Sequence, residues 1–476
     1  MRNVFVLSIA VPALLGAQQP IATNYVIDRV TVIDVASGVA QPNQRVVIEG
    51  TRVTSVAASG TSGAPTGATL IDGSGKYLIP GMWDMHVHVT GGPTTGHMLG
   101  LFLANGITGV RDMGTNLEAL VQWRAQSDGG RIVAPRIVGA GVLIDGKPIV
   151  YQGITWAVTT PDEARKAVDS LARRGVNFIK AYEMLRPEVY AALAEQAKLR
   201  GLPFAGHLPL MVSAEDAVRA GHKSFEHLRG LEIACSSKAD SLRRVAADMI
   251  EAGKDSAGMP LRSAIHVRLR PRAYETYDEA RCRALIQQMV QAGAWQTPNL
   301  VLATQAAFRH DTTEAFQRWV QYLPAGQRNA FRPSPASPAT DRGRAAQASA
   351  LRRAEWFLRT TKQLYDAGVR VLPGSDFPNP VMIPGASLHE ELALLVRAGL
   401  TPAEALRTAT QNPAIYLGLT DSLGTIAPGK AADLVLLDAN PLADIRNVGK
   451  VHSVWRAGRY LNRRTIDLML EGFAKQ

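Results

Sequence analysis

Met82-Trp83-Asp84-Met85-His86-Val87-His88 stands directly after an apolar run that ends Leu78-Ile79-Pro80-Gly81. In a strand, successive side chains point to opposite faces, so Asp84, His86 and His88 would share one face. Neutral imidazole binds zinc and similar divalent ions, and two histidines on one rigid strand fix two coordination positions. The stretch therefore predicts part of a metal site, or else an exposed polar pair on an edge strand. Further metal-binding residues elsewhere in the chain would favour the metal site over the exposed pair.

The composition is that of a globular protein. The chain has 476 residues, of which 46% are hydrophobic and 20% charged, so it can bury one large core and a smaller one. Its net charge is +11, with the densest basic runs at 262–272 and 342–353. We find no nucleic-acid motif and little aromatic interleaving in these runs, so we predict no nucleic-acid partner. The positive side chains then either lie on a solvated surface or create an electrostatic field that attracts anions to a pocket.

The N-terminus is similar to a secretory signal peptide. Residues 1–17 carry one early Arg, an apolar stretch from Val4 to Leu15 and a small-residue exit at Gly16-Ala17. The apolar stretch is short for a membrane span, so we expect export and cleavage rather than a stable membrane anchor, and a periplasmic or secreted protein. Cys235 and Cys282 are compatible with one disulfide in an oxidising compartment and equally with two separate thiols.

Short apolar segments alternate with amphipathic helical patterns through the middle of the chain. Besides the histidine-containing stretch, the strand candidates are 109–113, 136–139, 176–180, 203–207, 223–227, 294–298 and 369–373. Helical patterns include 161–174, 187–199, 213–220 and 388–417. Eight strands alternating with helices predict an α/β fold, a TIM-like (β/α)8 barrel over residues 79–420 with its active site at the carboxyl ends of the strands.

The two flanks and the two longest intervals have different patterns. Residues 22–78 and 421–465 consist of short β-segments with turns, and we predict that they join into one small β-sandwich domain. The intervals 231–293 and 301–368 are predicted helical insertions on the mouth side, where a lid and specificity residues would lie, with a Pro- and Ser-rich loop at 333–340.

Chemically active side chains recur at the ends of the predicted strands. In a barrel these ends converge however far apart they lie in sequence. They supply four imidazoles, one amine and one carboxylate, namely His86, His88, Lys180, His207, His227 and Asp376. A single strand-end histidine is more often packed or hydrogen-bonded, but the joint occurrence of this set is hard to explain in that way.

The order His-x-His, Lys, His, His, Asp resembles the amidohydrolase superfamily. Further motifs are similar to the branch that contains Xaa-Pro dipeptidases, imidazolonepropionase-like proteins and ochratoxin-degrading amidohydrolases. These motifs lie at 106–114, 225–227, 373–376, 388–392 and 423–435. One departure is Gly146-Lys147-Pro148, where that branch often has Gly-Gly-His, and it weakens any transfer of substrate contacts from this loop.

The resemblance implies a centre of two divalent metal ions, usually Zn²⁺. By analogy, His86, His88 and Asp376 would hold the buried ion and His207 and His227 the more exposed one. Lys180 would bridge the two as a carboxylated lysine, because a carbamate is an anionic two-oxygen ligand whereas an ammonium repels cations. An ion pair with a nearby carboxylate is the alternative role for this lysine.

The expected chemistry is hydrolysis by a metal-bridging hydroxide. Two metals lower the pKa of a shared water and polarise the scissile carbonyl. Asp376 would accept the proton and pass it to the leaving amine. Tyr182, on the same strand face as Lys180, matches the Lys-x-Tyr of the prolidase-like members, and we assign it either to substrate or oxyanion contact or to packing at the barrel mouth.

The predicted substrates are dipeptides or N-acyl amino acids, cleaved at an amide or peptide bond. Many of them carry a carboxylate, which an Arg such as Arg229 would bind. The alternatives are a cyclic-amide (imidazolone-like) or an ester or lactone hydrolase, and, in a different class, an exported binding protein without activity. His389 and Glu390 lack a second correctly spaced His, so we expect them to support the site or the fold. We also expect a homo-oligomer.

Overall fold

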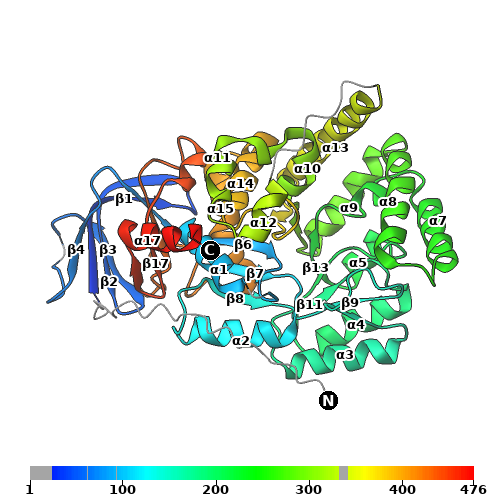
Figure 1. Cartoon of the computed structure of the whole chain (residues 1–476), viewed down its shortest axis with the longest axis horizontal. Coiled ribbons are helices and arrows are strands. Elements are labelled where there is room, and N and C mark those ends of the chain that lie inside the picture. Colours follow the sequence, from blue (N-terminus) through cyan, green and yellow to red (C-terminus); the bar gives the residue numbers. More distant parts are fainter. Residues whose placement is uncertain (1–23, 62, 93, 332–340, 476) are drawn as a thin grey trace, which may run out of the picture.

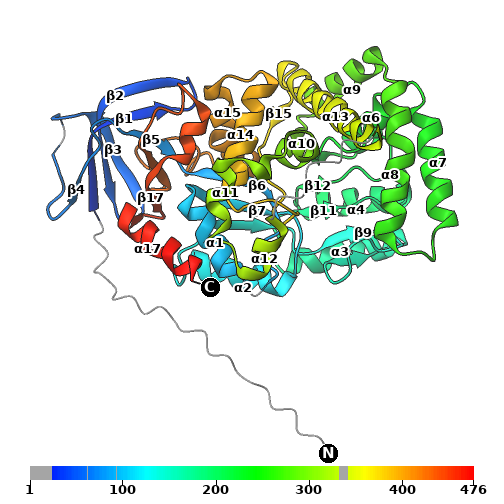
Figure 2. The same cartoon turned by 45° about the horizontal axis from the view of Figure 1, so that its top comes forward.

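The computed structural model of the chain describes residues 24–61, 63–92, 94–331 and 341–475 (Figure 1). The predicted signal peptide at 1–17 and the whole of the predicted loop at 333–340 lie outside these residues. At one end of the molecule lies a β-sheet, in the middle the parallel strands with their helices, and at the other end a group of helices (Figures 1 and 2).

Both flanks of the chain contribute to the terminal sheet. Its eight strands are β1 (Asn24–Asp34), β2 (Val39–Glu49), β3 (Arg52–Ala58), β4 (Thr69–Asp72), β5 (Tyr77–Pro80), β16 (Leu434–Leu437), β17 (Val451–Arg456) and β18 (Arg459–Leu461). β5 pairs antiparallel with β16, so the N- and C-terminal segments join as predicted. Ile27, Val46 and Trp455 are among the side chains of its separate buried core. The description as a sandwich of two sheets is not confirmed, because the strands pair into one sheet.

The central strands are all parallel and fall into two sheets. One has the order β10 (Thr155–Ala157), β9 (Leu143–Asp145), β11 (Ile179–Ala181), β12 (Phe204–Gly206), β13 (His222–Glu226), β14 (Trp295–Thr297) and β15 (Arg370–Val371). The other has the order β6 (Met82–Val87), β7 (Ile107–Asp112) and β8 (Arg136–Gly139). Each predicted strand is present, several of them shorter than predicted, and β9 and β10 are additional. Every residue of β6 is buried, as expected for a parallel strand covered on both faces.

Backbone hydrogen bonds connect the two parallel sheets at both sides. The amide of Met85, in β6, donates to the carbonyl of Pro373, which follows β15, at 2.9 Å. The amide of Asn177, before β11, donates to the carbonyl of Gly139 in β8 at 2.9 Å. The strand ends that carry the predicted site residues therefore lie along one continuous arrangement of parallel strands.

Helices follow the strands, and their boundaries have local causes. They are α1 (Thr95–Ala104), α2 (Leu117–Asp128), α3 (Pro161–Arg173), α4 (Pro187–Leu199), α5 (Ala214–Arg219), α14 (Ala386–Ala398), α15 (Pro402–Ala409) and α16 (Gln411–Leu417). At the start of α3, the Thr160 side chain accepts a hydrogen bond from the amide of Glu163, and the Glu163 carboxylate accepts one from the amide of Thr160. Pro161 occupies the first helical position. The predicted helices at 161–174, 187–199 and 213–220 are confirmed.

The two long intervals are helical, as predicted. Between β13 and β14 lie α6 (Leu231–Ala234), α7 (Ala239–Ala252), α8 (Gly258–Glu275) and α9 (Glu279–Gln291). Between β14 and β15 lie α10 (Leu300–Phe308), α11 (Glu314–Val320), α12 (Ala325–Arg328) and α13 (Asp341–Asp366), with short 3-10 turns at His310–Thr312 and Asn329–Phe331. A disulfide joins Cys235, at the end of α6, to Cys282 in α9, which resolves the two alternatives for these cysteines.

The chain ends in an additional helix, α17 (Arg463–Ala474), which was not predicted from the sequence. A further 3-10 turn, Ile445–Gly449, precedes β17. The ring of Phe473 in α17 stacks on His97 of α1 with 4.1 Å between the ring centroids. The C-terminal segment thus packs on both the terminal sheet and the central unit. Among the described residues, no helix has the length and apolar character needed to cross a membrane.

Candidate metal centre

Three side chains of types that bind metals lie close together, at the end of β6 and in the loop that follows β15. Oδ1 of Asp376 lies 3.4 Å from Nε2 of His86 and 3.4 Å from Nε2 of His88. One ligand atom from each of these residues lies within 4.8 Å of the others, close enough to share one ion. The structure therefore brings together the three residues predicted for the buried metal.

The two other histidines lie beside this group. His227, directly after β13, places Nε2 3.7 Å from Oδ2 of Asp376. Its ring centroid is 4.6 Å from that of His86 and 4.8 Å from that of His207, which directly follows β12. The four imidazoles and Asp376 thus form one cluster at the carboxyl ends of parallel strands, as the barrel prediction requires.

Lys180, in the middle of β11, is fully buried next to this cluster. Its Nζ has no hydrogen-bond partner among the described residues. Gly206 lies so close to the lysine stem that a Cβ at this position would be 3.1 Å from Cδ of Lys180. Burial lowers the pKa of Lys180 to about 8, against the opposing influence of Glu226 and Asp376. About a tenth of this amine is therefore neutral at pH 7, far more than for a lysine with the ordinary pKa.

Two buried carboxylates and one backbone carbonyl orient three of the histidines through the ring nitrogen Nδ1. Nδ1 of His86 lies 2.7 Å from Oε2 of Glu226, and Nδ1 of His207 lies 2.7 Å from Oε1 of Glu183. Nδ1 of His88 contacts the carbonyl of Gly114 at 2.6 Å. In each case Nδ1–H donates to oxygen, which leaves the Nε2 lone pair directed to the cluster.

Arg111 fixes Glu226 in turn. Both side chains are fully buried, and the guanidinium donates to Oε1 of Glu226 at 3.0 Å and to the carbonyl of Met85 at 2.6 Å. Burial lowers the pKa of His86 well below the usual value, and the positive charges of Lys180 and Arg111 add to this effect. His86 is therefore neutral, which is the form that binds metals.

The donor set fits divalent cations. Nε2 of His86, Nζ of Lys180 and Nδ1 of His227 are buried and have no hydrogen-bond partner in the described part of the chain. Unpaired buried polar atoms are unfavourable unless a ligand completes them. Four imidazoles and a carboxylate are the ligands that zinc prefers. The backbone has positive φ at His227 (62°) and Asp376 (58°), and such strain is frequent at functional sites.

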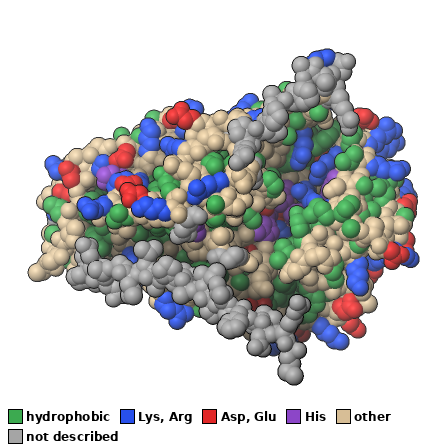
Figure 3. Space-filling view, viewed as in Figure 1, with side chains coloured by type: hydrophobic (Ala, Val, Ile, Leu, Met, Phe, Trp, Pro, Cys, Tyr) green, Lys and Arg blue, Asp and Glu red, His purple; other side chains and the backbone are tan. Residues whose placement is uncertain are grey.

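A cavity of about 820 Å³ opens onto the cluster. Figure 3 shows histidine side chains in a hollow near the middle of this face. Tyr182 lines the cavity, with its ring centroid 4.3 Å from that of His207, and Arg229 lines it as well. The cavity is large enough for a dipeptide-sized molecule.

Other residues considered from the sequence have structural contacts. His389 is half-buried, and its Nε2 contacts the carbonyl of Asn105 at 2.9 Å; Glu390 pairs with His310 at 3.1 Å. Both therefore support the fold. No role was predicted for three further buried residues, Arg111, Glu183 and Glu226, although Arg111 and Glu226 lie within the motifs at 106–114 and 225–227 and Glu183 directly follows Tyr182.

Comparison with known proteins agrees with this geometry. Residues 345–461 match the model of the amidohydrolase family, and the structure is similar over 96% of its length to bottromycin amidohydrolase, with a TM-score of 0.70 and 24% identity over 91% of that chain. The family match thus covers about a quarter of the chain, and the structural match shows that the chain has the fold of this amidohydrolase. The chain also has the fold of a Xaa-Pro dipeptidase solved with methionine in its active site, with a TM-score of 0.65, 19% identity, and 92% and 100% of the two chains covered.

Sequence relatives match over shorter segments. The chain is 43% identical to imidazolonepropionase of Deinococcus deserti over 101 residues, which is 20% of this chain and 25% of that relative. It is 33% identical to ochratoxinase of Aspergillus niger over 111 residues, 22% of each chain. The chain thus matches about a quarter of the length of these curated relatives.

Proposed function

We propose that this protein is a member of the amidohydrolase superfamily, a metal-dependent hydrolase that cleaves amide or peptide bonds of small substrates such as dipeptides or N-acyl amino acids. The observation that carries the proposal is the group of His86, His88 and Asp376, whose ligand atoms lie within 4.8 Å of one another, with the unpartnered Nζ of Lys180 buried beside it. Structures with the same fold include a Xaa-Pro dipeptidase and a bottromycin amidohydrolase, which supports amide hydrolysis.

The centre would hold two divalent ions, with Zn²⁺ the best match to its donors. His86, His88 and Asp376 would hold one ion, and His207 and His227 the other. Lys180 would bridge them as a carbamate, formed when its neutral amine adds carbon dioxide and releases a proton. The pKa of about 8 supports this role, because a lysine with an ordinary pKa would be almost fully protonated at neutral pH.

Two divalent ions at these residues would supply an activated water and polarise the scissile carbonyl. The remaining steps belong to the chain. Asp376, between the four imidazoles, holds the proton removed from the attacking water at its carboxylate and delivers it to the leaving amine. Tyr182, in the cavity wall beside His207, donates a hydrogen bond from its hydroxyl to the developing oxyanion, and burial keeps this hydroxyl protonated by raising its pKa well above the usual value.

The proposal includes closure of the parallel strands into a (β/α)8 barrel. The contacts Met85–Pro373 and Asn177–Gly139 between the two parallel sheets support it. The residue limits 79–420 for the barrel and 22–78 with 421–465 for the small β-domain are part of the same proposal.

A cyclic-amide hydrolase is the second candidate function. The 43% identity to imidazolonepropionase over 101 residues favours it. The Xaa-Pro dipeptidase and bottromycin amidohydrolase folds cover over 90% of this chain, and for that reason we place linear amides first. An ester or lactone hydrolase is the remaining alternative.

Export to an oxidising compartment is also part of the proposal. The disulfide between Cys235 and Cys282 supports it, since disulfides persist mainly outside the cytosol. The N-terminal sequence of the mature protein from its natural host tests it, and a chain that begins at Met1 would contradict it. A homo-oligomer stays a prediction, to be checked by light scattering.

The decisive experiment is a hydrolysis screen. The full chain, loaded with Zn²⁺, is incubated with a library of dipeptides and N-acyl amino acids, and released amine is measured. We expect metal-dependent release from a subset of the library, lost in the Asp376→Asn variant. No release from any member, with activity on cyclic amides, esters or lactones, would favour the alternatives, and retained metal without any hydrolysis would indicate a binding protein.

A further inference from the structure

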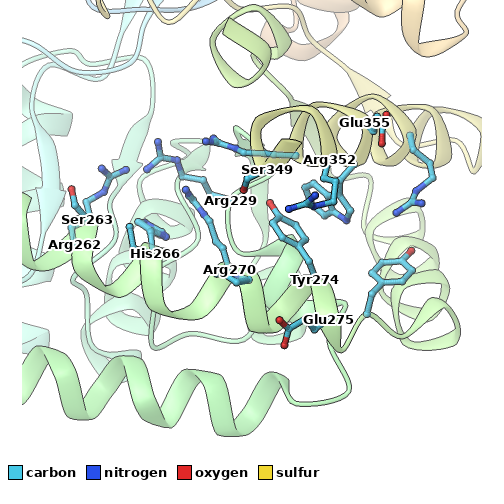
Figure 4. Close-up of a pocket in the computed structure, with 16 residues that line it drawn as sticks. Arg229, Arg262, Ser263, His266, Arg270, Tyr274, Glu275, Ser349, Arg352 and Glu355 are labelled. Carbon is cyan, nitrogen blue, oxygen red and sulfur yellow. The ribbon is translucent and has the colours of Figure 1, made fainter. Parts of the chain in front are cut away.

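A second large pocket lies between α8 and α13, in the two helical insertions. Its volume is about 970 Å³. Figure 4 shows Arg270 and Tyr274 extending from α8 into the space below α13, which contributes Arg352. Six arginines line this pocket, which we call the arginine pocket: Arg229, Arg262, Arg270, Arg352, Arg353 and Arg359.

Only some of these arginines form ion pairs with acidic side chains. Arg229 and Arg262 both contact Oε1 of Glu183, at 2.8 and 2.7 Å. Arg270 pairs with Glu232 at 3.1 Å.

The three arginines from α13 have no such partner. No carboxylate of the described residues lies within 4.0 Å of a side-chain nitrogen of Arg352, Arg353 or Arg359. The pocket also contains Glu275, which pairs outside this set with Arg272 at 3.3 Å, and Glu355. The pocket therefore carries an excess of positive charge on the α13 side.

Buried hydrogen-bond donors in the pocket wall have no acceptor. Nε1 of Trp356, a side chain only 5% exposed, has no partner among the described residues, and neither has Nε of Arg262, which is 8% exposed. Nε of Arg353 is unpartnered as well. These three nitrogens have almost no accessible surface, so they belong to the packing of the pocket wall, and the guanidinium ends of the arginines are the groups that remain for a ligand. Tyr274 lies 5.5 Å from Trp356, ring centroid to ring centroid, and adds an aromatic wall.

The arginine pocket adjoins the metal centre. Arg229 lines both the arginine pocket and the cavity over the cluster. Glu183 connects the two sites, since it contacts Arg262 on one side and Nδ1 of His207 on the other, at 2.7 Å in each case. A single extended molecule can therefore approach both sites past Arg229.

We propose that the arginine pocket is a subsite for an anionic group of the substrate, a carboxylate or a phosphate, remote from the scissile bond. Planar guanidinium groups bind either oxyanion through paired hydrogen bonds. The inference rests on the proposed function, because it takes the hydrolysed molecule to be the ligand. It narrows the substrate class to acyl amino acids or dipeptides with a second anionic end.

The first test measures anion binding without any catalysis. The full chain is titrated with inorganic phosphate and followed by calorimetry. We expect one binding event, weakened about tenfold by Arg353→Gln and by Arg352→Gln, whose exposed side chain can be replaced without a folding defect. The matched control is Arg268→Gln, an exposed residue on α8 that does not line the pocket and should leave binding unchanged. No phosphate binding, or equal weakening by the control, would overturn the proposal.

The second test uses substrates. Pairs of library members that differ only in a remote carboxylate or carboxamide are compared with the wild type and Arg352→Gln. We expect the variant to raise KM about tenfold for the acid alone, with kcat unchanged. Equal KM changes for acid and amide would refute the subsite. Phosphate binding that depends on Arg352, combined with no hydrolysis of any library member, would instead refute the proposed function.

Discussion

Replacement of Lys180 by Met should stabilise the metal-free protein. A lysine with a pKa of about 8 inside the fold and 10.5 in the unfolded chain opposes folding when it is charged, because its Nζ is buried without a partner among the described residues. This lowering corresponds to about 3 kcal/mol at pH 7. Methionine has a similar volume and no charge, so Lys180→Met should gain an amount of this order while it loses the bridging group of the metal centre.

The sign of the pH dependence follows from the same values. Between pH 8 and 10.5 the unfolded chain holds more protons on Lys180 than the folded chain, so the stability of the metal-free wild type rises with pH in this window. The advantage of Lys180→Met should therefore be full below pH 8 and shrink as the pH approaches 10.5.

The assay is urea unfolding of metal-free protein at several pH values, followed by circular dichroism. The control is Lys223→Met: Lys223 is half-buried, and its Nζ donates to the carbonyl of Tyr416 at 2.8 Å, so its removal should give no comparable gain. A Lys180→Met variant that is less stable than the wild type at pH 7 would show that the amine is well solvated or paired, contrary to this expectation.

Three further predictions concern the residues around the site. Glu226→Gln should weaken zinc binding about 10- to 100-fold in a competition titration with a chelator, because a histidine ligand loses its orienting carboxylate. Asp376→Asn should lower kcat by about 10²- to 10⁴-fold in the amine-release assay while mass spectrometry still detects bound metal. Cys235→Ser should lower the free energy of unfolding by about 2–5 kcal/mol in urea, with KM unchanged, because the disulfide joins helices outside the metal centre.

Glu226→Gln has a matched control variant, and each of the three predictions has a result that would contradict it. Glu232→Gln removes another buried carboxylate that pairs with an arginine, Arg270, and should reduce stability without changing zinc affinity. Equal loss of affinity in both Glu variants would argue against a specific role of Glu226. Full activity of Asp376→Asn would exclude it as the proton carrier, and unaltered stability of Cys235→Ser would show that the disulfide contributes little.

The sequence predicted what depends on local pattern and on strand order. The helix at 187–199 was predicted with both boundaries correct, because Pro187 marks its start and the apolar spacing continues to Leu199. The convergence of His86 and Asp376, which are 290 positions apart, followed from their placement at strand ends. These inferences need only periodicity and the topology of parallel strands.

Other features depend on contacts that sequence patterns do not encode. The pairing of Arg111 with Glu226 joins two strands across the interior, and although both residues lie in quoted motifs, nothing in the sequence indicates that they pair. The helix at Arg463–Ala474 had a signal in Asn462, which caps it, and in the spacing of Ile466 and Leu470, but the preceding β-segments suggested that the sheet continued. The terminal strands were predicted as a sandwich because alternation does not reveal how many sheets they form.

Anomalous X-ray diffraction at the zinc edge, from crystals of zinc-loaded full-length protein, locates the proposed ions themselves and is the strictest test of the metal centre. We expect two peaks, one beside His86, His88 and Asp376 and one beside His207 and His227, with density for a carboxylated Lys180 between them. Saturated crystals that show no peak within bonding distance of these side chains would contradict the proposed centre.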